Sequence, residues 1–142
     1  MANCVISDPP VYMDEIPKWD KQTDADGDAM GAVIEKILNN TAYNKMVGDR
    51  LNHTTSVTLT TAGWTGSAAP YEQTVTVEGA TEDMEAILVS ALDEDAGVDA
   101  QKAYAKAFGI ISSGVASLGD GTATFKVYKK PVTDCTVGLK GV

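Results

Sequence analysis

The stretch TDADGDAM, residues 23–30, holds the densest group of side chains with the chemistry to bind a metal ion. Asp24, Asp26 and Asp28 match positions 1, 3 and 5 of a twelve-residue calcium loop, and Glu35 matches position 12. The position that needs glycine for a sharp turn holds alanine, and the window runs into the apolar stretch GAVIEKIL. Because a helix cannot wrap its own first turns around an ion, the pattern predicts a helix start rather than a calcium site.

The remaining polar residues show no sequence pattern that is typical of a catalytic site. The single histidine, His53, has no cluster of His or Cys residues with which to bind a metal, and no nucleophile is paired with it in the sequence. Acidic residues cluster at 82–85 and 93–95, but each cluster adjoins an expected strand end, as solvated turns do. No phosphate loop or dinucleotide fingerprint is present. We therefore expect a protein that is not an enzyme and that holds no metal and no cofactor.

Trp64 and Tyr71 flank the small-residue loop TGSAAP. An exposed aromatic pair on a β-sandwich can stack on sugar rings, which makes these two residues a candidate glycan-binding pair. The alternative is that Trp64 caps the hydrophobic core or a subunit interface. We favour this alternative.

Composition excludes several classes of partner. The chain has 142 residues and a formal net charge of −9, so it repels phosphate backbones and anionic membrane surfaces. This charge leads us to expect no nucleic-acid partner. We also expect no membrane partner, because no apolar run approaches the ~20 residues that span a bilayer. Two cysteines are too few for a disulfide scaffold. The N-terminus lacks the basic and apolar regions of a signal peptide, which favours synthesis in a cytoplasm.

In residues 1–53 we expect an arm followed by a helical segment, which together serve attachment and oligomerisation. Three prolines keep residues 1–22 extended. The arm is too apolar for a free tail, so we expect it to lie on its own domain, on a sister subunit or on a foreign partner. Residues expected to anchor the arm are Val11, Tyr12, Ile16 and Trp19.

A helix is expected from about Asp24, with Thr23 as its N-cap and a break at the NNT sequence of residues 39–41. Heptad spacing suggests that the helix forms an oligomer seam with polar asparagine layers. The alternative is one amphipathic helix packed on its own domain, with both asparagines in a loop. The seam residues are expected to be Met30, Val33, Ile37, Asn40, Asn44 and Val47.

Residues 54–142 predict a compact β-rich domain. SVTLTTAGW and EQTVTVEG alternate apolar residues with threonines, as half-buried strands do. EAILVSALD is either a central strand or a short helix, and DAQKAYAKAFGI a helix. Asp120-Gly121 predicts a hairpin turn, followed by strands whose inward residues are Ala123, Phe125 and Val127, then Cys135, Val137 and Leu139. The expected fold class is α+β, mainly β: an N-terminal extended arm and helix, followed by a small antiparallel β-sandwich-like domain with one short helix.

The stretch TLTTAGWTGSAAPYEQTVTVEGAT and the final GTATFKVYKKPVTDCTVGLKGV resemble a module in virion structural proteins of tailed bacteriophages that infect Gram-positive bacteria. The segment DEIPKWDKQTDADGDAMGAVIEKILNNTAYNK resembles the attachment segment that precedes such modules. The resemblance implies a tail-fibre, baseplate or head-fibre component, made in the host cytoplasm and located in the virion. It implies a homotrimer that docks on another virion protein through residues 1–22. The alternatives are a capsid decoration or adaptor protein, and a carbohydrate-binding module for host cell-wall glycan.

Overall fold

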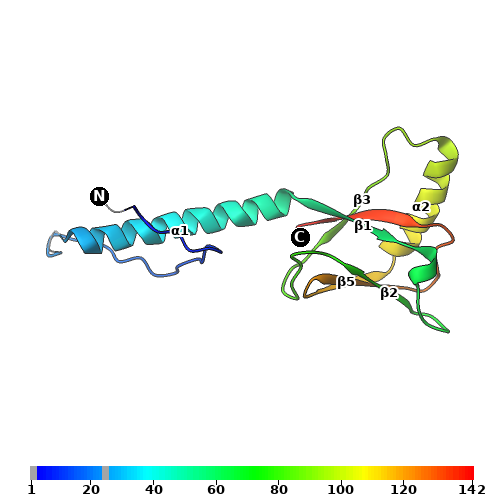
Figure 1. Cartoon of the computed structure of the whole chain (residues 1–142), viewed down its shortest axis with the longest axis horizontal. Helices are drawn as coiled ribbons and strands as arrows, with labels where there is room; N and C mark the ends of the chain where they lie inside the picture. The colour runs from blue at the N-terminus through cyan, green and yellow to red at the C-terminus, as the bar shows by residue number, and fades with distance from the viewer. Residues whose placement is uncertain (1–2, 24–25) are drawn as a thin grey trace. The chain divides into compact units, whose positions relative to one another are not determined.

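The computed structural model describes residues 3–23 and 26–142 and divides into two compact units, Met1–Arg50 and Leu51–Val142. The first unit holds the extended arm and most of the long helix α1, Gly27–Asn52. The second unit is a β-rich domain with one further α-helix, α2, Val98–Ser112, and a short 3-10 turn, Thr61–Gly63 (Figure 1). The expected fold class, α+β and mainly β, is confirmed.

Helix α1 begins three residues later than the sequence suggested, because Asp26 rather than Thr23 is its N-cap. The Asp26 carboxylate accepts a hydrogen bond from the backbone N–H of Asp28 at 2.9 Å, which satisfies a donor in the first turn. Thr23 instead caps a turn with Asp20, whose backbone N–H donates to the Thr23 hydroxyl at 3.0 Å. The Asp20 carboxylate also accepts from the Gln22 backbone N–H, which lowers the pKa of that carboxyl. Asp24, part of the expected helix start, lies outside the described residues.

The expected break at residues 39–41 is wrong, and α1 continues through all three. Asparagine and threonine disfavour helix interiors because their side chains compete for nearby backbone groups. Here the side-chain oxygens of Asn39 and Asn40 accept hydrogen bonds from the arm rather than from their own helix. The Thr41 hydroxyl donates to the carbonyl oxygen of Ile37 at 2.9 Å, so it is satisfied without unwinding the turn.

The β-rich domain consists of two three-stranded antiparallel sheets (Figure 1). The first sheet has the order β1-β6-β3 and the second the order β2-β5-β4. The segment EAILVSALD forms a strand, β3, rather than a helix, but it lies at an edge of the first sheet and not at its centre as expected. The strands are β1 Thr54–Leu59, β2 Tyr71–Thr76, β3 Ile87–Ser90, β4 Val115–Gly119, β5 Thr122–Val127 and β6 Cys135–Lys140.

Alternation along the strands separates core from surface. All six residues expected to point inward from β5 and β6 are buried, and Gly121 adopts the positive φ of 66° that the β4–β5 hairpin needs. The outer faces carry threonines that pair across strands, Thr58 with Thr136 and Thr74 with Thr124, each at 2.9 Å between hydroxyl oxygens. Burial raises the pKa of the Cys135 thiol, as expected for a small core residue.

Helix α2 packs against β5 and β6, the central strands of the two sheets. It therefore lies at the opening between the sheets and does not cover the outer face of either one. Ala107 and Ile111 enter the core, and the Tyr104 ring stacks on Phe108 with 5.6 Å between centroids. The Tyr104 hydroxyl donates to the carbonyl oxygen of Thr136 at 2.9 Å and accepts from the backbone N–H of Ala91 at 2.9 Å. Tyr104 thus ties α2 to both β6 and the end of β3.

Replacing Tyr104 with phenylalanine is expected to lower the free energy of unfolding of the β-rich domain by about 1–3 kcal/mol, because two part-buried backbone groups lose their partner. The measurement is urea denaturation followed by circular dichroism. Tyr128→Phe is the matched control, since the Tyr128 side chain is 78% exposed and its loss should change stability by less than about 0.5 kcal/mol. Equal stability of the two variants would contradict this role of Tyr104.

Candidate interaction surface

Two adjacent asparagines clamp the arm onto α1. Asn39 Oδ1 accepts hydrogen bonds from the backbone N–H of Ser7 at 2.9 Å and from its hydroxyl at 2.7 Å, while Asn39 Nδ2 donates to the carbonyl oxygen of Val5 at 3.4 Å. Asn40 Oδ1 accepts from the backbone N–H of Met13 at 2.7 Å, and Asn40 Nδ2 donates to the Met13 carbonyl oxygen at 3.0 Å. Each side-chain amide therefore pairs with arm backbone, as a neighbouring strand would.

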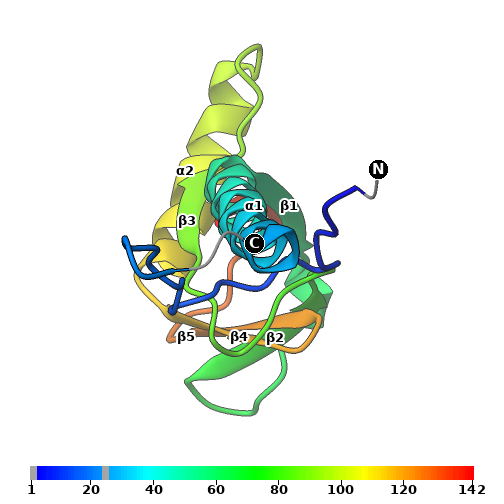
Figure 2. The ribbon, with the colours of Figure 1, turned by 90° about the vertical axis from the view of Figure 1, so that its left-hand side faces the viewer.

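The arm passes the helix twice, once in each direction (Figure 1). On the first pass, the backbone N–H of Val5 donates to Glu35 Oε1 at 3.1 Å. On the second pass, Lys36 Nζ donates to the carbonyl oxygen of Glu15 at 3.2 Å. Because the first pass bonds Glu35 and Asn39 and the second bonds Lys36 and Asn40, the two passes lie side by side along one half of the helix. In Figure 2, where α1 is seen nearly end-on, the arm runs from the right of the helix, beneath it, to its left.

The opposite half of α1 carries apolar side chains that the arm leaves uncovered. Ile34 is 47% exposed and Ile37 is 49% exposed, and Met30 and Leu51 are similarly exposed. Their spacing alternates between four and three residues along the helix, which is the spacing of a coiled-coil seam. We call all the positions with this spacing the outer face, whether or not they are apolar. They are Met30, Ile34, Ile37, Thr41, Asn44, Gly48 and Leu51.

The residues expected to form an oligomer seam differ in their exposure, and the seam itself stays a prediction. Met30, Ile37 and Asn44 are exposed and remain on the outer face. Val33 is only 8% exposed, and Asn40 is occupied by the arm of its own chain. Val47 is half-buried. Val33 and Asn40 are thus less accessible to another subunit than Ile34 and Thr41, which occupy neighbouring exposed positions on the helix.

A second apolar surface lies on the arm itself. Apart from the Ser7 hydroxyl, the clamp holds the arm through backbone atoms, and the apolar side chains of the arm take no part in its hydrogen bonds. Tyr12 also packs on α1 through Tyr43, with 5.6 Å between ring centroids, but half of its surface remains exposed. We call the exposed set the arm surface, and it consists of Val11, Tyr12, Ile16 and Trp19.

The N-terminal unit has almost no core of its own. Within its described residues, 3–23 and 26–50, Val33 is the only apolar side chain that is buried. A single helix and an extended arm gain little stability in water without buried apolar area. Exposed apolar side chains grouped on such a unit mark candidate interaction surfaces.

The structure contradicts the glycan-binding pair. Trp64 is 4% exposed and belongs to the hydrophobic core, so its ring offers no face to a sugar. Tyr71 is half-buried, and Lys130 Nζ lies 4.7 Å from the centroid of its ring. The same Lys130 Nζ donates to the Trp64 carbonyl oxygen at 3.0 Å, which holds the lysine in place. The favoured alternative, that Trp64 caps the core, agrees with this packing.

The described part of the chain carries neither a metal-ligand cluster nor a membrane-spanning helix. Across residues 3–23 and 26–142, no three His, Cys, Asp or Glu side chains come together as metal ligands would. Neither α1 nor α2 in that described part has the length and hydropathy of a membrane-spanning helix. His53 is exposed, and its carbonyl oxygen accepts from the backbone N–H of Gly141 at 3.2 Å. Comparisons with models of protein families, with curated proteins and with solved structures find no match to this chain.

Proposed function

We propose that this chain is a non-enzymatic structural subunit of a tailed-bacteriophage virion, a fibre-like or baseplate appendage protein. In this proposal three chains assemble through the outer face of α1, the arm surface attaches them to another virion protein, and the β-rich domain is displayed. The observation that carries the proposal is the outer face, an exposed heptad seam on a unit with almost no core of its own. The virion setting comes from the sequence resemblance alone.

The composition of the outer face favours three subunits. In heptad terms Ile34 lies at an a position and Ile37 at a d position, and isoleucine at both positions shifts parallel coiled coils from dimers toward trimers. Thr41 and Asn44 form the next two layers. Polar residues at such layers fix register and oligomer number at a cost in stability. The Thr41 hydroxyl donates to the carbonyl oxygen of Ile37, so this donor would keep its partner when Thr41 is buried between subunits.

The arm surface supports attachment to a different protein. It lies away from the outer face, because the arm covers the other half of α1, so a trimer joined through the outer face would still expose it. Aromatic residues such as Tyr12 and Trp19 are enriched at the energetically dominant positions of protein interfaces. A capsid decoration or adaptor protein would use the same two surfaces in the same way, so it remains the alternative within this class.

Attachment is tested by replacing all four residues of the arm surface with serine and purifying virions assembled with the variant. The substitutions remove the contact of Tyr12 with Tyr43 but keep all five hydrogen bonds of the clamp, so we expect the arm to stay on α1. We expect immunoblots of the particles to lose the variant almost completely, since apolar anchors dominate interface energies. A matched set of four serines at exposed apolar residues of the β-rich domain, Ile87, Val98, Val115 and Val132, should be incorporated normally. Incorporation of the arm variant into virions at the normal level would contradict the anchoring role of the arm surface.

A further inference from the structure

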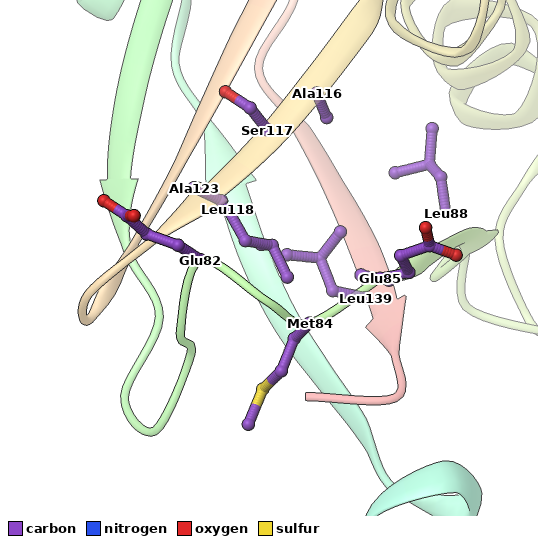
Figure 3. Close-up of a pocket in the computed structure, with 10 residues that line it drawn as sticks. Glu82, Met84, Glu85, Leu88, Ala116, Ser117, Leu118, Ala123 and Leu139 are labelled. Carbon is purple, nitrogen blue, oxygen red and sulfur yellow. The ribbon is translucent and has the colours of Figure 1, made fainter.

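The β-rich domain has an open groove between the two sheets, on the side where the edge strands β3 and β4 lie (Figure 3). Its volume is about 420 Å³, which is within the range of pockets that hold ligands. Buried Ala123 and Leu139 form its floor. Leu88 of β3 and Leu118 of β4 form its walls and are half-buried.

The groove exists because the sandwich is not closed on this side. Helix α2 fills only part of the opening between the central strands β5 and β6. Ala116 of β4 points inward, since it lies opposite the buried Phe125 in the strand register, yet it is exposed. An inward position that stays exposed on an edge strand marks a gap where a further side chain can enter.

Strand β4 also offers an unused backbone edge. It pairs with β5 on one side and with no other strand in the part of the chain that the structure describes. Edge strands with free N–H and C=O groups pair readily with an added extended segment. Such an added strand would place alternate side chains toward the groove, beside Ala116 and Leu118.

The rim of the groove carries negative charge. Glu82 and Glu85 are exposed and lie on two sides of Met84 (Figure 3). No basic side chain belongs to the described residues that line the groove. An occupant is therefore favoured if it bears positive charge next to an apolar residue. A second copy of this chain, with its net charge of −9, fits this rim poorly.

We propose that the groove binds an extended segment of a partner protein in which apolar residues are flanked by lysine or arginine. The segment adds to the free edge of β4, its inward side chain fills the space above Ala123 and Leu139, and its basic residues lie against Glu82 and Glu85. Main-chain hydrogen bonds supply affinity in this mode of recognition, and the pocket and the charges supply specificity. This site is on the β-rich domain and does not depend on the arm or on the outer face of α1.

Two synthetic peptides test the proposal on the full-length chain. The first is acetyl-Lys-Val-Thr-Val-Thr-Lys-amide, and the second has the same core with glutamate in place of both lysines. Each is titrated to millimolar concentration against ¹⁵N-labelled protein while backbone amide shifts are recorded. We expect saturable shifts at β3 and β4 with the lysine peptide only. Saturable binding of both peptides with equal affinity, or of neither, would overturn the proposal, as would shifts confined to other strands.

Charge variants then test the rim. Replacing Glu82 and Glu85 with glutamine should weaken binding of the lysine peptide by about tenfold or more, since two close opposite charges are lost. Glu78→Gln with Glu94→Gln is the matched control, because both residues are exposed and neither lines the groove. An equal loss of affinity in the two variants would show that the net charge rather than the rim attracts the peptide, and it would overturn the assigned site.

Discussion

A chain that carries both Ile34→Asp and Ile37→Asp should be monomeric at concentrations where the unaltered chain is a trimer. In the proposed seam each layer brings together three copies of one side chain, so each substitution would bury three carboxylates beside one another. Burying an unpaired charge costs several kcal/mol, and mutual repulsion adds to that cost. Losing two adjacent isoleucine layers also removes about 1.5–3 kcal/mol of apolar burial for each side chain. Size-exclusion chromatography with light scattering measures the change.

The matched control for this experiment is Val98→Asp with Val132→Asp. Both valines are more exposed than the two isoleucines and belong to the β-rich domain. This variant adds the same charge to the chain but should keep the trimer mass. Circular dichroism should show strand signal in both variants, because none of the four positions belongs to the core. An unchanged mass for the isoleucine variant would contradict the assignment of the outer face.

A chain that carries Asn39→Ala and Asn40→Ala should release the arm from α1. The two side chains make five hydrogen bonds to the arm, to Val5, Ser7 and Met13. At about 0.5–1.5 kcal/mol of net stabilisation for each bond, their loss should speed exchange of the arm amides by well over tenfold. Hydrogen exchange of the Ser7 and Met13 backbone amides, followed by NMR, measures the effect directly.

Asn44→Ala is the control for the clamp, because Asn44 lies on the same helix but on the outer face. It should leave exchange at Ser7 and Met13 unchanged. Exchange in the double variant that matches the unaltered chain would show that other contacts hold the arm, among them the bond from Val5 to Glu35 and the tilted packing of Tyr12 on Tyr43.

The β-rich domain was the most predictable part of the chain, because a period of two fixes which side chains face inward. Phe125, Val137 and the other expected inward residues of β5 and β6 are all buried. The order of the strands in the sheets could not be predicted, because different antiparallel arrangements of such short strands have the same hydrophobic pattern. The edge position of β3 and the groove beside it follow from the pairing of β3 with β6, which are far apart in the sequence. A local sequence pattern cannot predict such a pairing.

The errors in the N-terminal unit have one physical source, which is the return of the arm onto the helix. Local propensity predicts a break at Asn39 and Asn40, but the arm supplies partners for both side chains and the helix continues. The heptad period could be seen in the sequence, but not which half of the helix the arm covers. That choice leaves Ile34 and Thr41 exposed and makes Val33 and Asn40 less accessible. The helix start moved because Asp26 caps α1 while Thr23 is used in a turn with Asp20.

Sedimentation equilibrium of the unaltered full-length chain over a wide concentration range shows whether the chain assembles with itself through α1. We expect a species of three times the 14.9 kDa chain mass, with dissociation only at low concentration. A mass of 14.9 kDa at every concentration would contradict self-assembly through the outer face. A stable dimer would contradict the trimer that the isoleucine layers favour.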